Sequence, residues 1–170
     1  MLNLSTVMKN MKNTSLADAI SLAAAAFVDK TDKSGKPYIL HCLHVMATVD
    51  QTDPELMTIA VLHDIVEDTN YTLMDLFHLG YSDRVINALE LLTHEEDVSY
   101  EDYIAAISSN EDATKVKIAD LMHNSDITRL KGVRDKDLER IQKYHKAFVV
   151  LTAAQATQRK HRITHGLHAT

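Results

Sequence analysis

The sequence predicts an all-α protein that folds as a single domain. Its 170 residues include only 4 glycines and 2 prolines, the two residue types that most disfavour helix interiors. No stretch alternates strictly between apolar and polar residues, as a half-buried strand does. A chain of this length can bury one sizeable core. We therefore expect one domain over residues 1–170, with its core over about 16–151 and a frayed C-terminal tail.

Helix signals occur along most of the chain. Ser15 is a suitable N-cap for a first helix, and Pro54 after Asp53 fits the first position of a third. Thr72 with Asp75, and Ser99 with Asp102, are close relatives of the capping box, and Gly80 fits a helix C-terminus. We expect helices over about residues 15–29, 39–52, 53–68 and 113–124, a loop over 30–36, and a long final helix from about 136 into the 150s.

Charge and cysteine content restrict the possible partners. The net charge of −6 argues against a nucleic-acid partner, although a local basic pocket can still bind a small anion. The single cysteine excludes an intramolecular disulfide and fits a reducing cytoplasm. Lysines and asparagines interrupt the apolar run that a signal peptide needs near the N-terminus, and no apolar run is long enough to span a bilayer. We expect a cytoplasmic protein with a small-molecule partner and a possible homo-oligomeric state.

Potential metal ligands occur in three apolar segments. They are His41, the adjacent pair His63 and Asp64, and Asp120. Burying such groups costs free energy unless a partner satisfies them, and one divalent cation held between three helices would pair with all of them. Two imidazoles and two carboxylates suit Mn²⁺, Fe²⁺ or Zn²⁺ without choosing among these ions.

Two further acids follow at helical spacing. Glu67 lies four residues after His63, and Asp68 lies four after Asp64, so a continuous helix would present two stacked pairs. One pair could bind the metal while the next turn reaches the substrate, where Glu67 or Asp68 could orient a water molecule or carry protons. A purely structural interpretation stays open at this point, with both acids as charges near a helix end and Asp120 as a buried hydrogen-bond acceptor.

Three blocks of sequence resemble the HD-domain hydrolases. They are PYILH at 37–41, LHDIVEDT at 62–69 and KIADLMHN at 117–124. The nearest branch is the (p)ppGpp hydrolase domain of the RelA/SpoT proteins, together with the small stand-alone alarmone hydrolases. The blocks occur in that family's order, and weaker similarity runs from about Leu16 to Leu151.

The resemblance implies a fold, a metal and a reaction. It implies an HD-domain helical bundle and a single Mn²⁺, bound by His41, His63, Asp64 and Asp120. Glu67 and Asp68 match the catalytic acidic pair. The implied reaction removes the 3′-pyrophosphate of ppGpp or pppGpp to give GDP or GTP and pyrophosphate. Nucleotide contacts are implied, less directly, for Lys33, Lys117, Asn124, Arg140 and Tyr144.

The sequence departs from the family pattern at two positions. Asp32 stands where the family has an arginine that stacks on or caps the base. An aspartate there removes a planar cation and adds repulsion near phosphates, which bears on nucleotide selectivity; Tyr38 or Tyr144 could compensate. Cys42 replaces a proline after His41, and we expect it to be a small buried hydrophobic residue.

Other polar residues have weaker signals. His44 lies one turn from His41, but the PYI register selects His41 as the ligand. His123 is expected to pack or to face solvent. A basic rim for phosphates, or simply a solvated face, could be formed by Lys115, Lys117, Arg129, Lys131 and Arg134.

Three functions therefore compete. The first is an Mn²⁺-dependent alarmone 3′-pyrophosphohydrolase. The second is an HD phosphohydrolase with a different nucleotide substrate, which Asp32 favours. The third is a nucleotide-binding regulatory module without turnover, against which the complete acidic pair of Glu67 and Asp68 argues.

Overall fold

The structure is a computed structural model that describes residues 14–166. Within that range no β-strand forms, and the all-α prediction is confirmed; Thr31 and Pro37 make one isolated bridge. The helices are α2 (Leu16–Ala26), α3 (Ile39–Thr48), α4 (Pro54–Leu62), α5 (Ile65–Asp68), α6 (Leu73–Leu79), α7 (Asp83–Leu92), α8 (Tyr100–Ile107), α9 (Glu111–Asn124), the 3₁₀ turn η1 (Ile127–Arg129) and α10 (Asp135–Gly166).

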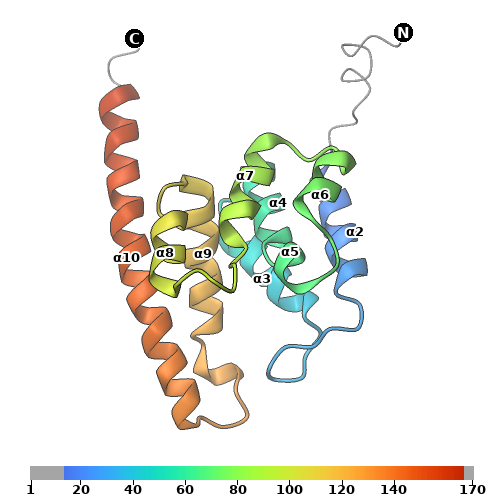
Figure 1. Ribbon diagram of the computed structural model, residues 1–170, viewed down its shortest axis with the longest axis vertical. Coiled ribbons are helices and arrows are strands. Elements are labelled where there is room, and N and C mark those ends of the chain that lie inside the picture. Colours follow the sequence, from blue (N-terminus) through green and yellow to red (C-terminus); the bar gives the residue numbers. More distant parts are fainter. Residues whose placement is uncertain (1–13, 167–170) are drawn as a thin grey trace.

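Helix α4 is the centre of the bundle. It packs against α2, α3, α7 and α9, and its residues from Thr58 to Leu62 are all buried. A helix that is apolar on every side is stable only when other helices surround it. Helix α9 joins this group to α10, which runs along one edge of the molecule beside α8 (Figure 1).

Several helix ends follow the predicted capping chemistry. Ser15 and Thr72 each form a complete capping box, with Asp18 and Asp75 respectively. Asp53 caps α4 by accepting a hydrogen bond from the Leu56 amide, with Pro54 at the first helical position. Gly80 ends α6 with a φ of 97°, a left-handed conformation that glycine adopts without steric cost.

The helix ends differ from the prediction at three places. Helix α2 ends at Ala26 rather than Asp29. The last helix extends to Gly166, well beyond the predicted 150s, so the expected fraying does not begin at residue 161; residues 167–170 lie outside the described range. The predicted helix over 53–68 is divided, because α4 ends at Leu62 and α5 begins at Ile65.

The division of that helix affects the site directly. Asp64 has φ −102° and ψ 2°, outside the helical region. Neighbours on a regular helix point about 100° apart, whereas the turn brings His63 Nε2 within 2.9 Å of Asp64 Oδ2. The prediction of two stacked pairs on one continuous helix is therefore wrong.

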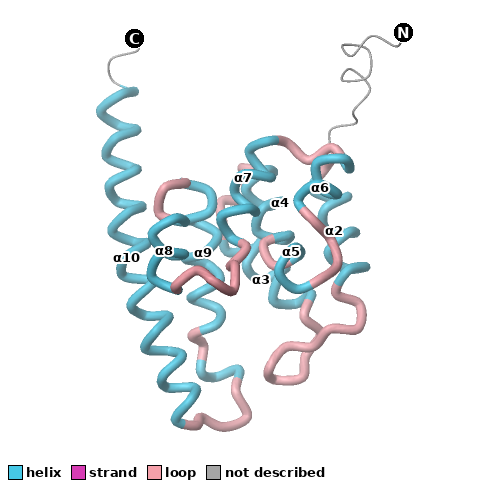
Figure 2. Tube along the Cα trace, viewed as in Figure 1, coloured by secondary structure: helices cyan, strands magenta, loops and turns pink. Residues whose placement is uncertain are grey.

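Two loops lie together at one end of the molecule. Figure 2 shows the α2–α3 loop and the α9–α10 connection at the same end, and an ion pair of 2.7 Å between Asp32 Oδ2 and Arg129 Nη2 joins them. Segments far apart in sequence thereby form one rim.

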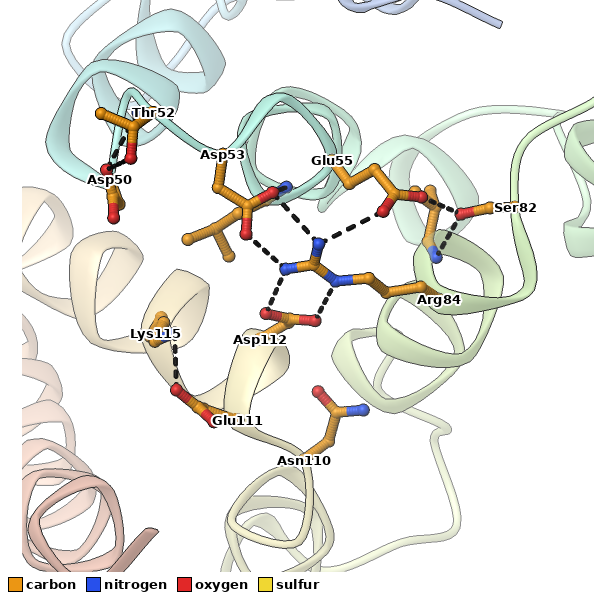
Figure 3. A network of polar contacts seen from close by, with 12 residues as sticks. Asp50, Thr52, Asp53, Glu55, Ser82, Arg84, Asn110, Glu111, Asp112 and Lys115 are labelled. Atoms are coloured by element: carbon orange, nitrogen blue, oxygen red, sulfur yellow. Dashed lines mark hydrogen bonds and ion pairs between the residues drawn. The ribbon is translucent and has the colours of Figure 1, made fainter. Parts of the chain in front are cut away.

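Arg84 ties three helices together away from that rim. Its guanidinium lies 2.6 Å from Asp53 Oδ2 and 3.2 Å from Glu55 Oε2 at the start of α4, and 2.7 Å from Asp112 Oδ2 at the start of α9 (Figure 3). The same acids lie at the N-termini of the two helices, where their negative charge interacts favourably with the positive ends of the helix dipoles. This network fixes α4 and α9 relative to α7.

Candidate metal centre and active site

A polar pocket of about 440 Å³ opens beside α3, α5 and α9. That volume is in the range of small-molecule sites. Both acidic and basic side chains line it, together with aromatic rings. The lining includes His41, Asp64, Glu67, Asp68 and Asp120, the cations Lys30, Lys33, Lys117, Arg129, Arg140 and Lys143, and the aromatic residues Tyr38, His94, Tyr100, Tyr103 and Tyr144.

The four residues expected as metal ligands converge, and three of them, His41, Asp64 and Asp120, also line this pocket. His41 Nε2 lies 3.2 Å from His63 Nε2, 3.5 Å from Asp64 Oδ2 and 3.3 Å from Asp120 Oδ1. His63 Nε2 lies 3.7 Å from Asp120 Oδ1. His41, His63 and Asp120 are buried. Two imidazole nitrogens and two carboxylate oxygens at these spacings form a donor set that fits a divalent cation with mixed N/O preference.

Neighbouring charges oppose the effect of burial at the candidate ligands. Burial alone would lower the pKa of His63, but Asp64 and Asp120 raise it to about 10. Burial likewise opposes protonation of His41, yet hydrogen bonds to Asp120 and Asp64 raise its pKa. Against the effect of burial, His63 and His41 hold the pKa of Asp64 well below its usual range. Binding of a cation by these groups would release protons.

A second layer of contacts orients the ligands. His63 Nδ1 lies 2.8 Å from the Ala60 carbonyl oxygen, to which it donates, so Nε2 faces the site. The Tyr38 hydroxyl donates to Asp64 Oδ2 at 2.5 Å; burial and Asp64 raise the pKa of Tyr38, so the hydroxyl keeps its proton. Such outer contacts fix ring orientation and metal affinity. The hydroxyl of Tyr38 is thereby engaged with a candidate ligand.

Lys117 and Asn124 contact a predicted ligand. Lys117 Nζ lies 2.9 Å from Asp120 Oδ2, and Asn124 Nδ2 donates to Asp120 Oδ1 at 2.5 Å. Burial opposes the charge on Lys117, but Asp120 raises its pKa well above the ordinary value. Both residues also line the pocket, so they contact Asp120 from positions beside the pocket.

The acidic pair lies at the mouth of the pocket. Glu67 and Asp68 are both exposed and line it. Glu67 Oε2 accepts a hydrogen bond of 3.2 Å from the His94 amide, whereas Asp68 Oδ1 lies 2.5 Å from Lys30 Nζ. The two carboxylates are thus held by different elements, close to the four converging ligands.

The other expected nucleotide-contact residues also reach the pocket. Lys33, Arg140 and Tyr144 line it. Burial and the nearby cation of Arg140 lower the pKa of Lys33, and Arg140 is itself paired with Asp137 at 3.2 Å. Of the predicted basic rim, Lys117 and Arg129 line the pocket; the pocket lining does not include Lys115, Lys131 or Arg134.

Asp32 does not act as a free negative charge. Its Oδ1 accepts hydrogen bonds from the Ser34 amide at 2.8 Å, the Ser34 hydroxyl at 2.6 Å and the Lys36 amide at 2.9 Å, while Oδ2 pairs with Arg129. Burial works against these contacts, but they hold the pKa of Asp32 far below its usual range. Asp32 therefore shapes the loop and carries an arginine from another element to the rim.

Some residues of the pocket and of its surroundings could not be identified from the sequence. His123 was expected to pack or to face solvent, and its ring does pack on His44, with centroids 4.0 Å apart. The sequence did not indicate that its Nδ1 lies 2.6 Å from His41 Nδ1. His94, Tyr100, Tyr103 and Lys143 belong to no motif that points to the pocket. Tyr100, Tyr103 and Lys143 are marked by their neighbours only as parts of helices, and His94 lies in the connection between α7 and α8.

Cys42 is fully buried, as expected for a small hydrophobic residue. Its sulfur can also approach ligand atoms of His63 and Asp64 to within 4.8 Å. Burial raises the pKa of its thiol, so the thiol stays protonated.

Comparisons with known proteins agree with the resemblance in the sequence. No family model matches the chain. The chain is 31% identical over 103 residues to a GTP pyrophosphokinase of Streptomyces coelicolor, and 29% identical over 116 residues to a probable GTP pyrophosphokinase of Mycobacterium leprae. These matches span 54% and 62% of this chain but only 12% and 15% of the relatives' lengths.

A solved structure shares the whole fold. It belongs to a metazoan ortholog of SpoT that hydrolyses ppGpp and plays a role in starvation responses. The TM-score is 0.65 at 19% identity, over 92% of this chain and 98% of that one. The all-α architecture is thus shared with that structure, and the resemblance to the RelA/SpoT proteins is confirmed. None of the helices in the described range is long and apolar enough to cross a membrane.

Proposed function

We propose that this chain is a metal-dependent HD-domain phosphohydrolase that removes the 3′-pyrophosphate of ppGpp or pppGpp. Water attacks phosphorus, the bond between that phosphorus and the ribose 3′ oxygen breaks, and GDP or GTP leaves with pyrophosphate. The observation that carries this proposal is the convergence of His41, His63, Asp64 and Asp120 beside an acidic pair, in the fold of a protein that hydrolyses ppGpp.

We propose Mn²⁺ as the cation, with Fe²⁺ and Zn²⁺ as alternatives that the same donors accept. The chemistry supplied by a bound divalent cation is polarisation of a phosphoryl oxygen and a lower pKa for a water molecule. Because the four ligands come with fixed Nε2 and carboxylate orientations, the protein contributes a prearranged donor set.

The remaining pocket residues have distinct proposed roles. Glu67, fixed by the His94 amide, orients the attacking water or takes its proton, and Asp68 assists it from the mouth of the pocket. Lys33, Arg140 and Lys143 face the pocket as cations and offset phosphate charge. Tyr144, Asn124 and Lys117 contribute contacts to the nucleotide from α9 and α10.

The test is pyrophosphate release from ppGpp by metal-stripped protein, with and without added Mn²⁺. We expect turnover only with Mn²⁺, and none in Asp64→Ala. Glu67→Gln should still bind Mn²⁺ but lose about 10²–10⁴-fold in kcat, the usual contribution of a proton-transfer group. Tight Mn²⁺ binding with no release of pyrophosphate would contradict the proposal.

A different nucleotide substrate is the second candidate, favoured by Asp32. Asp32 stands where the family has an arginine, and it pairs with Arg129 in this structure, so the loop offers no free cation at that position and less local attraction for phosphate. A panel of 3′-phosphorylated guanine and adenine nucleotides in Mn²⁺ separates the candidates. Equal or faster turnover of the adenine compounds would favour the second.

A further inference from the structure

The imidazole of His41 has a second polar contact that faces away from the metal centre. Its Nδ1 lies 2.6 Å from His123 Nδ1. The two ring planes differ by only 14°, with centroids 4.9 Å apart. Because the nitrogens are so much closer than the centroids, the rings meet edge to edge, in the geometry of an in-plane hydrogen bond. One proton must lie between the two nitrogens, since two facing lone pairs would repel each other.

Arg129 decides which ring carries that proton. Its Nη1 lies 3.1 Å from His123 Nδ1 and 2.9 Å from the His123 carbonyl oxygen. A guanidinium has five N–H donors and no acceptor. The lone pair of His123 Nδ1 must therefore face the region shared by Arg129 and His41, and the shared proton belongs to His41 Nδ1.

Arg129 is fixed in turn by the α2–α3 loop. Asp32 Oδ2 accepts a hydrogen bond from Arg129 Nη2 at 2.7 Å, and three further hydrogen bonds hold the Asp32 carboxylate. A chain of contacts thus runs from the loop at the rim through Arg129 and His123 to His41.

We propose that His123 and Arg129 are positioning residues that fix the proton of His41 on Nδ1, so that Nε2 is the nitrogen presented to the cation. His63 reaches the same state through the Ala60 carbonyl, which can only accept. The Ala60 carbonyl thus keeps a proton on His63 Nδ1, as Arg129 and His123 keep one on His41 Nδ1. This inference rests on the metal centre of the proposed function, but not on the identity of the substrate.

The direct test is a two-bond ¹H–¹⁵N correlation spectrum of the histidine rings in metal-stripped, full-length protein near neutral pH. We expect a protonated Nδ1 on His41 and an unprotonated Nδ1 on His123. The expectation holds whether or not His41 Nε2 also carries a proton. The reverse assignment would overturn the proposal, and this measurement needs neither a cation nor a variant.

The second test is the affinity for Mn²⁺ and Zn²⁺, measured by competition with a chelator. His123→Leu should weaken binding about 10–100-fold, as loss of an outer contact to a metal ligand typically does. His123→Asn should restore most of it, because its side-chain oxygen can accept both hydrogen bonds. The affinity of Arg129→Met for the cation should lie between that of His123→Leu and that of His123→Asn. The matched control is Arg134→Met, on the same connection, whose cation pairs with Asp137.

Each outcome has a definite meaning. Unchanged affinity in His123→Leu would overturn the positioning role. Correct tautomers and the predicted affinity series in a protein that does not hydrolyse ppGpp would support this inference while contradicting the proposed substrate. If no cation binds to the wild-type protein, the proposal of a metal centre is wrong. The proposal that His123 and Arg129 present His41 Nε2 to a cation is then wrong as well.

Discussion

At the scale of single residues, the metal centre depends on neutral partners as much as on charges. Tyr38 donates to Asp64 Oδ2 and packs its ring against Phe27 and His41. Removing the hydroxyl would leave the ring contacts in place and take away one of the contacts that hold Asp64 Oδ2, while those of His63 and His41 remain. The effect of such a change should appear in metal affinity rather than in folding.

Tyr38→Phe should therefore weaken Mn²⁺ binding about 10–100-fold and change the free energy of unfolding of the metal-free protein little. Competition with a chelator measures the first quantity, and urea unfolding the second. Tyr71→Phe, outside the pocket lining, is the matched control and should bind as the wild type does. Wild-type affinity in Tyr38→Phe would mean that Asp64 is oriented by its imidazole neighbours alone.

The raised pKa of His63 makes a prediction about pH. Its folded-state pKa of about 10 lies above the ordinary value of 6.5, so protonated His63 stabilises the metal-free fold. That contribution is complete below pH 6.5 and is lost as the pH rises through 10. The free energy of unfolding in the presence of a chelator should fall across this window, and His63→Gln should flatten the fall. A constant profile in the wild type would show that the imidazole is already neutral.

The sequence identified the residues that converge, because each stands in a compact motif. It did not identify their partners. Asp32 and Arg129 are 97 positions apart, and no periodicity relates them. Lys117 and Asn124 were placed near the pocket, but their contact with Asp120 depends on side-chain rotamers. Pairings of this kind follow from tertiary packing and from nothing local.

At the scale of helices, capping residues predicted starts better than stops. Ser15, Asp53, Thr72 and Ser99 all act as N-caps, because a side-chain oxygen at that position bonds a nearby amide whatever the tertiary context. The break after Leu62 had no such signal. It contains neither glycine nor proline, and it coincides with the contacts of His63 to His41 in α3 and to Asp120 in α9, and of Asp64 to Tyr38 at the start of α3.

The Arg84 network should stabilise the packing of α4, α7 and α9. Arg84→Met would leave three carboxylates facing one another at the starts of α4 and α9. The arginine side chain is 38% exposed, so solvent screens part of the effect, and we expect a loss of about 1–2 kcal/mol in the free energy of unfolding. The loss should shrink at high salt.

Arg162→Met is the matched control for that change. Arg162 pairs with Glu111 at 3.2 Å, but its side chain is 71% exposed, and exposed ion pairs contribute little. Urea unfolding at low and high salt compares the two variants. Equal losses in both would indicate that Arg84 acts through its aliphatic stem rather than through its charge.

At the scale of the whole molecule, helical content and the position of the core follow from composition and apolar spacing. The length of α10 cannot be predicted from composition and apolar spacing. Its buried positions include Ala147 and Leu151, and beyond them the described contacts are a few polar ones, such as Gln158 Nε2 to the Ser108 carbonyl at 3.0 Å. The proposed core of about 16–151 therefore contains the pocket, and the outer turns of α10 extend past it.

Deleting residues 160–170 should cost less than about 1 kcal/mol in the free energy of unfolding and leave Mn²⁺ affinity unchanged. Deleting residues 147–170 removes Ala147 and Leu151 and should prevent stable folding. Circular dichroism with urea distinguishes the two. Failure of the shorter deletion to fold would show that the end of α10 supports the bundle.

The four candidate ligands come from different helices of the bundle. His41 belongs to α3, His63 and Asp64 to the α4–α5 turn, and Asp120 to α9. A bound cation would thus act as a removable cross-link between three helices. Any opening that separates two of them must first release the cation, so amide hydrogen exchange in α3, α4 and α9 should slow together when it is added. Exchange in α6 and in the outer turns of α10 should continue at its own rate.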